Sequence, residues 1–266
     1  MANTLAAQVS THGQWFHPEA LDPAAEIRLF LFPHAGSGAI IYRDWAGLLP
    51  PDIGAQAVTL PGRQERRDEA AFTAWDPLVD ALYEAVLAEC DYRPFAIFGH
   101  CLGAQLAYHL AVRMHREGVP EPLLLGMSGW APEGFFNPTK EHIGMPQEEL
   151  VDWIKRLGSF PAEIYDNPEM LKMIIPALRA DLSVAAQRVD EADPLPCPMV
   201  SYGGQDDPLM EERTAFSSWR PRSPHYLGHS EFSGGHFFID RHALAVISDF
   251  TRHLHRIAAA AADQPA

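Results

Sequence analysis

The sequence predicts an α/β domain with a mostly parallel central sheet flanked by helices. Two observations support this fold class. Short runs of β-branched and aromatic residues recur along the chain, and stretches of helical periodicity separate most of them. The 266 residues, 47% of them hydrophobic, fit one such domain with a large core. We therefore expect a single domain over residues 1–266.

Five strands and two flanking helices are expected in the core of this domain. The strands are Ile27–Phe32, Ala55–Leu60, Phe95–Phe98, Leu123–Met127 and Met199–Tyr202. The first is clearly bounded, because Pro33 and the glycines that follow stop it. Apolar residues recur at helical spacing over Trp75–Ala88 and Gly103–Met114, so both segments should form helices that pack on the sheet.

The alternation stops between about residues 130 and 190, where helical segments follow one another without a strand. These segments are Gln147–Leu157, Pro168–Ile175 and Ala177–Gln187. Asn167 is a suitable N-cap for the second segment, with Pro168 at its first position, and Pro176 should break or kink the chain that follows. We expect a helical insertion over about 130–190.

Charge and cysteine content narrow the range of partners. The chain has 20 basic and 35 acidic residues, which gives a net charge of −15. A protein of this charge repels nucleic acids and anionic membranes at long range, so binding to either is disfavoured. No stretch approaches the roughly 18 apolar residues of a membrane span, and the opening residues lack a signal-sequence core. Cys90, Cys101 and Cys197 form no CxxC pair, which favours a reducing compartment. We expect a cytoplasmic protein that binds neither nucleic acid nor membrane.

The strongest local motif surrounds Cys101. The strand at Phe95–Phe98 runs through Gly99-His100-Cys101-Leu102-Gly103 into the next helix, which is the nucleophile-elbow pattern with cysteine in place of serine. A nucleophile on such a sharp turn needs small residues two positions before and after it, because the backbone approaches closely there. The helix N-terminus favours a thiolate, and the N–H of Leu102 can face a bound carbonyl. The simpler alternative is a buried structural thiol beside glycines that end a strand.

Two later segments supply an acid and a base. Asp206 and Asp207 follow the strand at Met199–Tyr202, and His236 lies on a glycine-rich loop before a C-terminal helix. The order nucleophile, acid, histidine is that of α/β-hydrolases and differs from the orders in chymotrypsin and subtilisin. The hydrolase turn places its acid three residues after the last strand glycine and commonly before proline. This selects Asp207, with Asp206 in reserve.

A loop of small residues, 33–38, follows the first strand. It can turn a backbone N–H toward the nucleophile, and Ala35 is the expected partner of Leu102 in an oxyanion hole. A plain glycine turn is the alternative. The loop lacks the spacings of a dinucleotide site or a P-loop, and the histidines lack the spacing of a metal site. We expect no nucleotide, no metal and no cofactor.

Together these segments resemble the type II thioesterases that accompany polyketide synthases and nonribosomal peptide synthetases. The resemblance extends from about residue 28 to residue 252, and two of its segments are hard to obtain from a generic esterase. All the matching segments are Phe32 to Gly36, Leu60 to Arg63 with Arg66, Gly99 to Gly103, Pro176 to Asp181, Gly203 to Pro208 and Gly234 to Phe237; the second and fourth are the most specific.

The resemblance implies an α/β-hydrolase fold with a mobile helical lid. It also implies a thioesterase that removes acyl groups from the phosphopantetheine thiol of acyl or peptidyl carrier proteins. Cys101, Asp207 and His236 then form the catalytic triad, and Ala35 and Leu102 supply the oxyanion hole. The substrate, and not the enzyme, carries the phosphopantetheine.

One residue departs from that family, which normally has serine where this chain has Cys101. Serine converts a thioester into an oxygen ester, a downhill step, whereas cysteine forms another thioester and keeps the acyl group activated. The acyl group can then pass to water, or to a second thiol, amine or hydroxyl. The sequence leaves open a hydrolase, an acyltransferase and a carrier-binding protein of weak catalysis, and the complete triad speaks against the third.

Further residues are expected around the site. Arg63, Arg66 and Arg67 should lie on a solvated loop, the alternative being that one of them binds the pantetheine phosphate or an acidic carrier. His100 should pack beneath the sheet. Bulky residues of the insertion should pack the lid on the core or line an acyl pocket; they are Trp130, Phe135, Phe136, Trp153, Phe160, Tyr165, Met170 and Met173.

Overall fold

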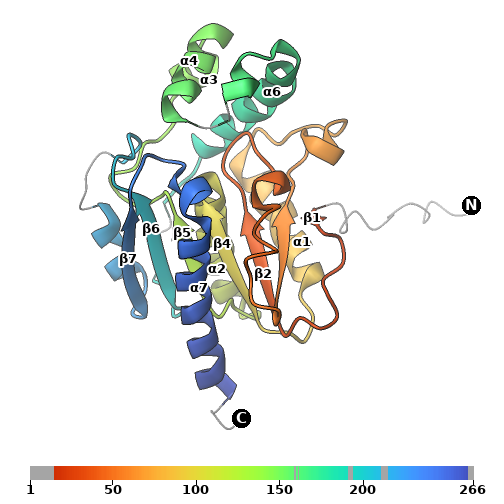
Figure 1. Cartoon of the computed structure of the whole chain (residues 1–266), viewed down its shortest axis with the longest axis vertical. Helices are drawn as coiled ribbons and strands as arrows, with labels where there is room; N and C mark the ends of the chain where they lie inside the picture. The colour runs from red at the N-terminus through yellow and green to blue at the C-terminus, as the bar shows by residue number, and fades with distance from the viewer. Residues whose placement is uncertain (1–14, 159, 161, 191–193, 211–214, 263–266) are drawn as a thin grey trace, which may run out of the picture.

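The computed structural model describes residues 15–158, 160, 162–190, 194–210 and 215–262. Its centre is a seven-stranded sheet in the order β1-β3-β2-β4-β5-β6-β7 (Figure 1). The short β1 pairs antiparallel with β3, and the other neighbours are parallel. The strands are β1 (Phe16–His17), β2 (Ile27–Phe32), β3 (Ile53–Val58), β4 (Phe95–His100), β5 (Leu125–Ser128), β6 (Met199–Gly204) and β7 (Tyr226–Phe232).

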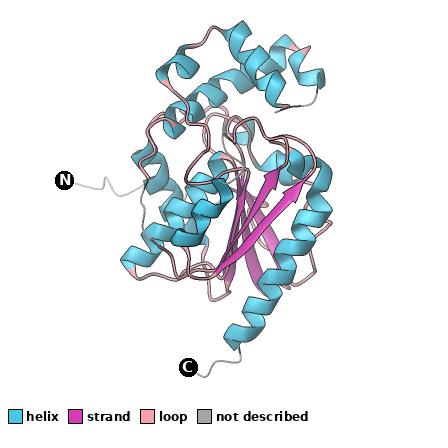
Figure 2. Ribbon diagram, turned by 90° about the vertical axis from the view of Figure 1, so that its left-hand side faces the viewer, coloured by secondary structure: helices cyan, strands magenta, loops and turns pink. Residues whose placement is uncertain are grey.

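Helices cover both faces of the sheet (Figure 2). On one face, α1 (Trp75–Glu89) and α2 (Leu102–Glu117) pack over the strands, and on the other lie α7 (Phe238–Ala262) and the 3-10 turn η2 (Ala39–Tyr42). Two further 3-10 segments are η3 (Gln64–Arg66) and η4 (Ala215–Arg222). No described helix is long and apolar enough to cross a membrane.

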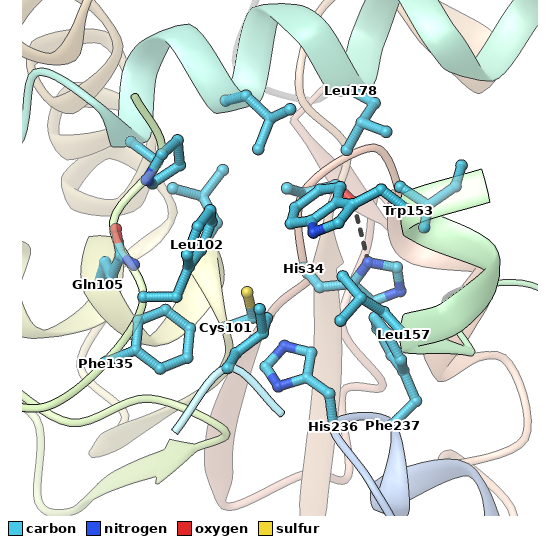
Figure 3. A pocket seen from close by; sticks show the side chains of 17 residues that line it. His34, Cys101, Leu102, Gln105, Phe135, Trp153, Leu157, Leu178, His236 and Phe237 are labelled. Atoms are coloured by element: carbon cyan, nitrogen blue, oxygen red, sulfur yellow. Dashed lines mark hydrogen bonds between the residues drawn. The ribbon is translucent and has the colours of Figure 1, made fainter. Parts of the chain in front are cut away.

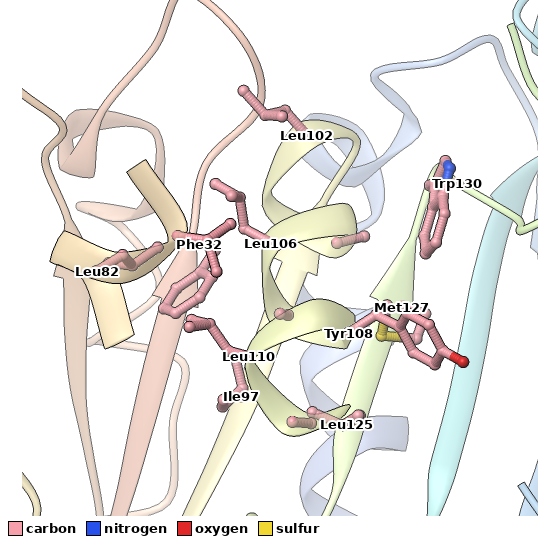
Figure 4. Packing of buried hydrophobic residues seen from close by; sticks show 14 of the residues in the cluster. Phe32, Leu82, Ile97, Leu102, Leu106, Tyr108, Leu110, Leu125, Met127 and Trp130 are labelled. Carbon is pink, nitrogen blue, oxygen red and sulfur yellow. The ribbon is translucent and has the colours of Figure 1, made fainter. Parts of the chain in front are cut away.

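The core follows from alternation along the strands. In β4, Phe95 and Ile97 join the cluster under α1 and α2, whereas Ala96 and Phe98 join the cluster under α7. Figure 4 shows Ile97 below Leu106 and Leu110 of α2. Every residue of β2, β4 and β6 is buried, as expected for parallel strands covered on both faces.

Four helices lie between β5 and β6, above the carboxyl ends of the strands (Figure 1). These lid helices are α3 (Lys140–Gly144), α4 (Gln147–Leu157), α5 (Ala162–Tyr165) and α6 (Pro168–Ala185). Asn167 caps α6 as predicted, since its side chain accepts the N–H groups of Glu169 and Met170 at 3.1 and 3.3 Å.

Of the two outcomes predicted for Pro176, a break or a kink, the break is wrong, because α6 continues through this residue. Proline removes one hydrogen bond from a helix interior. Here the packing of Ile175, Leu178 and Leu182 in the apolar cluster of the lid keeps the helix together across that position.

The sequence prediction also missed two strands. β2 has the predicted bounds, and the other four predicted strands differ from the observed ones by one or two residues at their ends. β1 has only two residues, and β7 lies at the sheet edge, half-buried along most of its length. β7 contains Gly228 at φ 117° and three consecutive polar residues, so it lacks the apolar run that marks the buried strands.

Candidate active site

Cys101 lies on the sharp turn between β4 and α2. Its φ of 56° is in the left-handed region, which costs a residue with a Cβ about 1–3 kcal/mol. Glycine is required on either side, since a Cβ on Gly99 would lie 2.3 Å from the oxygen of Gly103, and one on Gly103 would lie 2.1 Å from that of Phe32. The turn directs the thiol into a pocket under the lid helices (Figure 3).

His236 and Asp207 form a buried pair beside this turn. His236 donates from Nδ1 to Oδ2 of Asp207 at 2.7 Å, and both side chains are 1% exposed. The other oxygen of Asp207 accepts the N–H of Leu209 at 2.9 Å. Asp206 is exposed, and its backbone N–H donates to Gly234. Of the two candidate acids, Asp207 is therefore the partner of His236.

The charge state of His236 depends on its neighbours. Burial alone lowers its pKa, but the charges of Asp207 and Cys101 outweigh burial and raise it to about 10. His236 and Cys101 line the same pocket, and Nε2 of His236 is buried beside the thiol of Cys101 (Figure 3). Nε2 is therefore placed to exchange a proton with the thiol or with a bound substrate.

Two other histidines are packed near His236. The ring of His100 lies 5.0 Å from that of His236 and 6.2 Å from that of His34. Burial lowers the pKa of both neighbours, that of His34 to about 4, so they are neutral at pH 7. His100 contacts Ser128 Oγ through Nδ1 at 2.9 Å. It is fully buried, as predicted, and its ring packs against that of His236.

The two residues predicted to donate to the oxyanion lie close to Cys101. Ala35 and Leu102 both line the pocket with Cys101. Leu102 is the first residue of α2, so its N–H has no carbonyl partner within the helix. Ala35 precedes Gly36, whose N–H donates to Asp181 Oδ2 of α6 at 2.7 Å. A lid helix thus holds the loop that carries Ala35.

Arg63 and Arg66 are buried, so the predicted solvated loop is wrong for both. Arg63 donates to the two oxygens of Asp181 at 2.5 and 2.7 Å, and also to the carbonyl of Ser37 at 2.9 Å. Arg66 makes two hydrogen bonds to Glu69, at 2.6 and 2.8 Å. Both guanidinium groups are therefore buried and paired with carboxylates of this chain, whereas Arg67 is exposed, as predicted.

The pocket is largely apolar and lies between the core and the lid helices (Figure 3). Of the predicted lining residues, Phe135, Phe136 and Trp153 face it. Trp130 instead packs in the core, while Phe160 and Tyr165 pack within the lid and Met170 and Met173 are exposed. Sequence reasoning missed Gln105, which lines the pocket one helical turn after Cys101. No group of three or more metal-ligating side chains occurs among the described residues.

The profile of the thioesterase domain matches residues 27–254 of this chain. The chain belongs to the thioesterase family. It is 28% identical to the gramicidin S biosynthesis protein GrsT of Aneurinibacillus migulanus, over 87% of this chain and 90% of that protein. It is 32% identical to a probable cadicidin biosynthesis thioesterase of Streptomyces griseus, over 92% of this chain and 67% of that protein.

Solved structures agree with this assignment. The type II thioesterase BorB from the borrelidin biosynthetic cluster superposes with a TM-score of 0.77 at 31% identity, covering 90% of this chain and 97% of that one. The α/β-hydrolase fold predicted from the sequence is therefore confirmed, as is the resemblance to thioesterases of polyketide and nonribosomal peptide pathways.

Proposed function

We propose that this protein is a type II thioesterase that hydrolyses acyl thioesters on the phosphopantetheine arm of carrier proteins, through an acyl group on Cys101. One observation carries the proposal: the Asp207–His236 pair places the Nε2 side of the imidazole beside the elbow thiol in the same pocket. The relatives support the pathway, because GrsT and BorB are described as parts of antibiotic biosynthesis clusters or systems.

In the first half of the reaction, the thiol proton of Cys101 is held on Nε2 of His236, and the thiolate attacks the carbonyl carbon of the substrate thioester. The N–H groups of Ala35 and Leu102 stabilise the oxyanion. When the tetrahedral intermediate collapses, its bond to the pantetheine sulfur breaks and His236 gives that sulfur the proton. The acyl group is then bonded to Sγ of Cys101.

In the second half, His236 takes a proton from water, and the hydroxide attacks the acyl-Cys101 carbonyl. Collapse breaks the bond between the carbonyl carbon and Sγ, which releases the free acid, and the thiolate of Cys101 again shares the proton that His236 took from water. Asp207 holds the imidazole with Nδ1 as the donor throughout, so that Nε2 remains the nitrogen that exchanges protons. The apolar pocket around the thiol excludes other water and receives the acyl chain.

Acyl transfer is the second candidate, and the cysteine itself favours it. Acyl-Cys101 is a thioester of about the same energy as the substrate, so it can react with a second thiol, an amine or a hydroxyl in place of water.

The partner is an acyl or peptidyl carrier protein in either case. With a net charge of −15, the chain repels an acidic carrier at long range, so docking depends on a local basic or apolar patch. The three free cysteines fit the cytoplasm.

A product assay with an acyl carrier protein tests the proposal. The protein is mixed with an acyl-loaded carrier, with and without an unloaded second carrier, and free acid, acyl-protein and acylated second carrier are followed by mass spectrometry. Free acid as the product supports hydrolysis. An acyl-protein that persists until the second carrier is added supports transfer.

Two variants sharpen that assay. Cys101→Ala should abolish both acyl-protein and product, whereas Cys197→Ala, at a buried thiol far along the chain, should abolish neither. Cys101→Ser should retain hydrolysis, because the relatives of this family use serine chemistry on the same elbow. If Cys101→Ala formed product at the rate of the unmodified protein, the proposed role of the thiol would be wrong.

A further inference from the structure

Gln105 is a polar side chain in an otherwise apolar part of the pocket. It is 2% exposed, and its neighbours in the lining are Leu102, Phe135 and Leu182. Among the described residues, its Oε1 has no hydrogen-bond partner. A buried carbonyl oxygen without a donor is destabilising, so such a group in a binding pocket indicates that a ligand supplies the donor.

The position of Gln105 relative to Cys101 limits where that donor lies. The N–H of Gln105 donates to the carbonyl of Cys101 at 3.2 Å, so Gln105 lies one helical turn after the elbow residue. Both side chains line the same pocket. An acyl group on the sulfur extends into this pocket, so the carbon atoms close to its carbonyl are the ones nearest the turn of α2 that carries Gln105.

The surroundings also limit the chemistry of the donor. An ammonium group would need a carboxylate in the pocket, and the buried carboxylate closest to the reaction, Asp207, is engaged by His236 and Leu209. Without such a partner, burying a charge costs far more than burying a hydroxyl. The donor that fits is uncharged, and a hydroxyl is the smallest such group.

We infer that Gln105 selects acyl groups with a hydroxyl at the second or third carbon, and that it does so by accepting a hydrogen bond from that hydroxyl. The inference rests on the proposed function, since it assumes that the acyl group is carried by Cys101. Gln105 is a specificity residue and takes no part in proton transfer. A saturated acyl group of the same length leaves its Oε1 unpartnered and is bound less well.

Model thioesters of N-acetylcysteamine test this assignment. The specificity constant kcat/KM is measured for butyryl, 2-hydroxybutyryl, 3-hydroxybutyryl and 2-aminobutyryl thioesters, with the unmodified protein and with Gln105→Leu. The unmodified protein should prefer a hydroxybutyryl over the butyryl thioester by roughly 10-fold or more, since sites built to bind a hydroxyl reject analogues that lack it. Gln105→Leu should bring that ratio close to one, mainly by faster reaction of the butyryl thioester.

Two controls separate selection from a change in the helix. Leu106→Met alters the next residue of α2, which packs in the core and not in the pocket, and should keep the ratio of the unmodified protein. Thermal unfolding of Gln105→Leu should occur at the same or a higher temperature, because the variant removes a buried oxygen without a partner. A lower unfolding temperature would show that Gln105 has a structural partner and would overturn the inference.

The remaining outcomes are distinct. Equal preference in the unmodified protein, or an unchanged preference in Gln105→Leu, would overturn the role of Gln105 while leaving thioester hydrolysis intact. Preference for the 2-aminobutyryl thioester would contradict the choice of an uncharged donor. If no thioester reacted and Cys101 stayed unacylated, the proposed function itself would fail, and the inference with it.

Discussion

Arg63, in the loop after β3, and Asp181, in the lid helix α6, form an ion pair through two hydrogen bonds, with side chains 6% and 2% exposed. The same carboxylate accepts the N–H of Gly36, next to the proposed oxyanion donor Ala35. One acidic residue of the lid therefore fixes both the loop after β3 and the loop that carries Ala35.

Removal of this carboxylate should reduce both stability and rate. Asp181→Ala leaves Arg63 buried without its partner, and breaking a buried ion pair costs about 3–5 kcal/mol of unfolding free energy. The loop at Gly36 also loses its anchor, so kcat should fall by roughly 10-fold to 100-fold, less than for loss of an oxyanion donor itself. Urea unfolding and thioester hydrolysis measure the two effects. Lys172→Ala, which removes an exposed ion pair with Glu169, should cost less than about 1 kcal/mol.

The elbow should not tolerate a methyl group at Gly103. A Cβ there would lie 2.1 Å from the carbonyl oxygen of Phe32, so Gly103→Ala must push α2 away from β2. We expect loss of several °C in unfolding temperature and of most hydrolysis. Gly144→Ala is the matched control, because nothing lies within 4 Å of its added Cβ. Similar behaviour of the two variants in calorimetry would contradict the close approach seen at the elbow.

A pair of neighbouring substitutions tests the choice of acid. Asp207→Asn keeps the shape of the side chain but removes the charge that orients His236, so kcat should fall by roughly 10⁴-fold, as in other triads. Asp206→Asn changes an exposed side chain and should alter kcat by less than about twofold. Steady-state hydrolysis of one thioester is sufficient. A larger effect at Asp206 would reverse the assignment.

Buried histidines should make the protein sensitive to acid. Burial lowers the pKa of His34 and of His109 to about 4, whereas histidine in an unfolded chain titrates near 6.5. Between these values the unfolded chain binds more protons, so stability is complete above about pH 6.5 and falls as the pH is lowered toward 4. Each histidine contributes at most about 1.4 kcal/mol per pH unit in that window.

His109→Phe should therefore reduce the slope of unfolding free energy against pH between 6.5 and 4. The aromatic ring is kept because it packs 4.9 Å from Trp75, and the variant removes a buried Nε2 that has no partner among the described residues. Leu110→Val, on the same helix, should lower stability by about 1 kcal/mol at every pH without changing the slope. An unaltered slope in His109→Phe would show that His109 does not cause the loss of stability at low pH.

The lid helices should open more readily than the core. No residue of α3 is buried and only Leu150 and Ile154 of α4 are, whereas most of α2 is buried. Backbone amides in weakly packed helices exchange through low-energy local opening. Hydrogen exchange followed by mass spectrometry should thus be faster over α3 and α4 than over α2. Equally slow exchange in all three would argue against a mobile lid.

The parts of the fold that the sequence predicts are those with local signals. β2 is an apolar run closed by Pro33, and the elbow glycines are spaced around Cys101 in the chain, so both could be located from short segments. The Arg63–Asp181 pair joins residues 118 positions apart. No local pattern indicates such a contact, and a charged loop was the natural prediction for Arg63.

Two other differences between the sequence prediction and the structure also arise from contacts between segments far apart in the chain. β7 owes its place to pairing with β6, although its own composition is polar. α6 passes through Pro176 because the apolar cluster of the lid stabilises the helix on both sides of that residue. In the site, Gln105 could have been found from its spacing after Cys101, but only the structure shows that its oxygen is buried without a partner.

The order of elements along the chain has a consequence for synthesis of the protein. Cys101 and its elbow belong to β4 and α2, whereas Asp207 and His236 follow β6 and β7, the last two strands of the sheet. A ribosome therefore exposes the thiol long before its base exists, and β5 remains an open edge until β6 is made. The emerging chain carries an unactivated thiol, and the ability to cleave a thioester arrives only with the final third of translation.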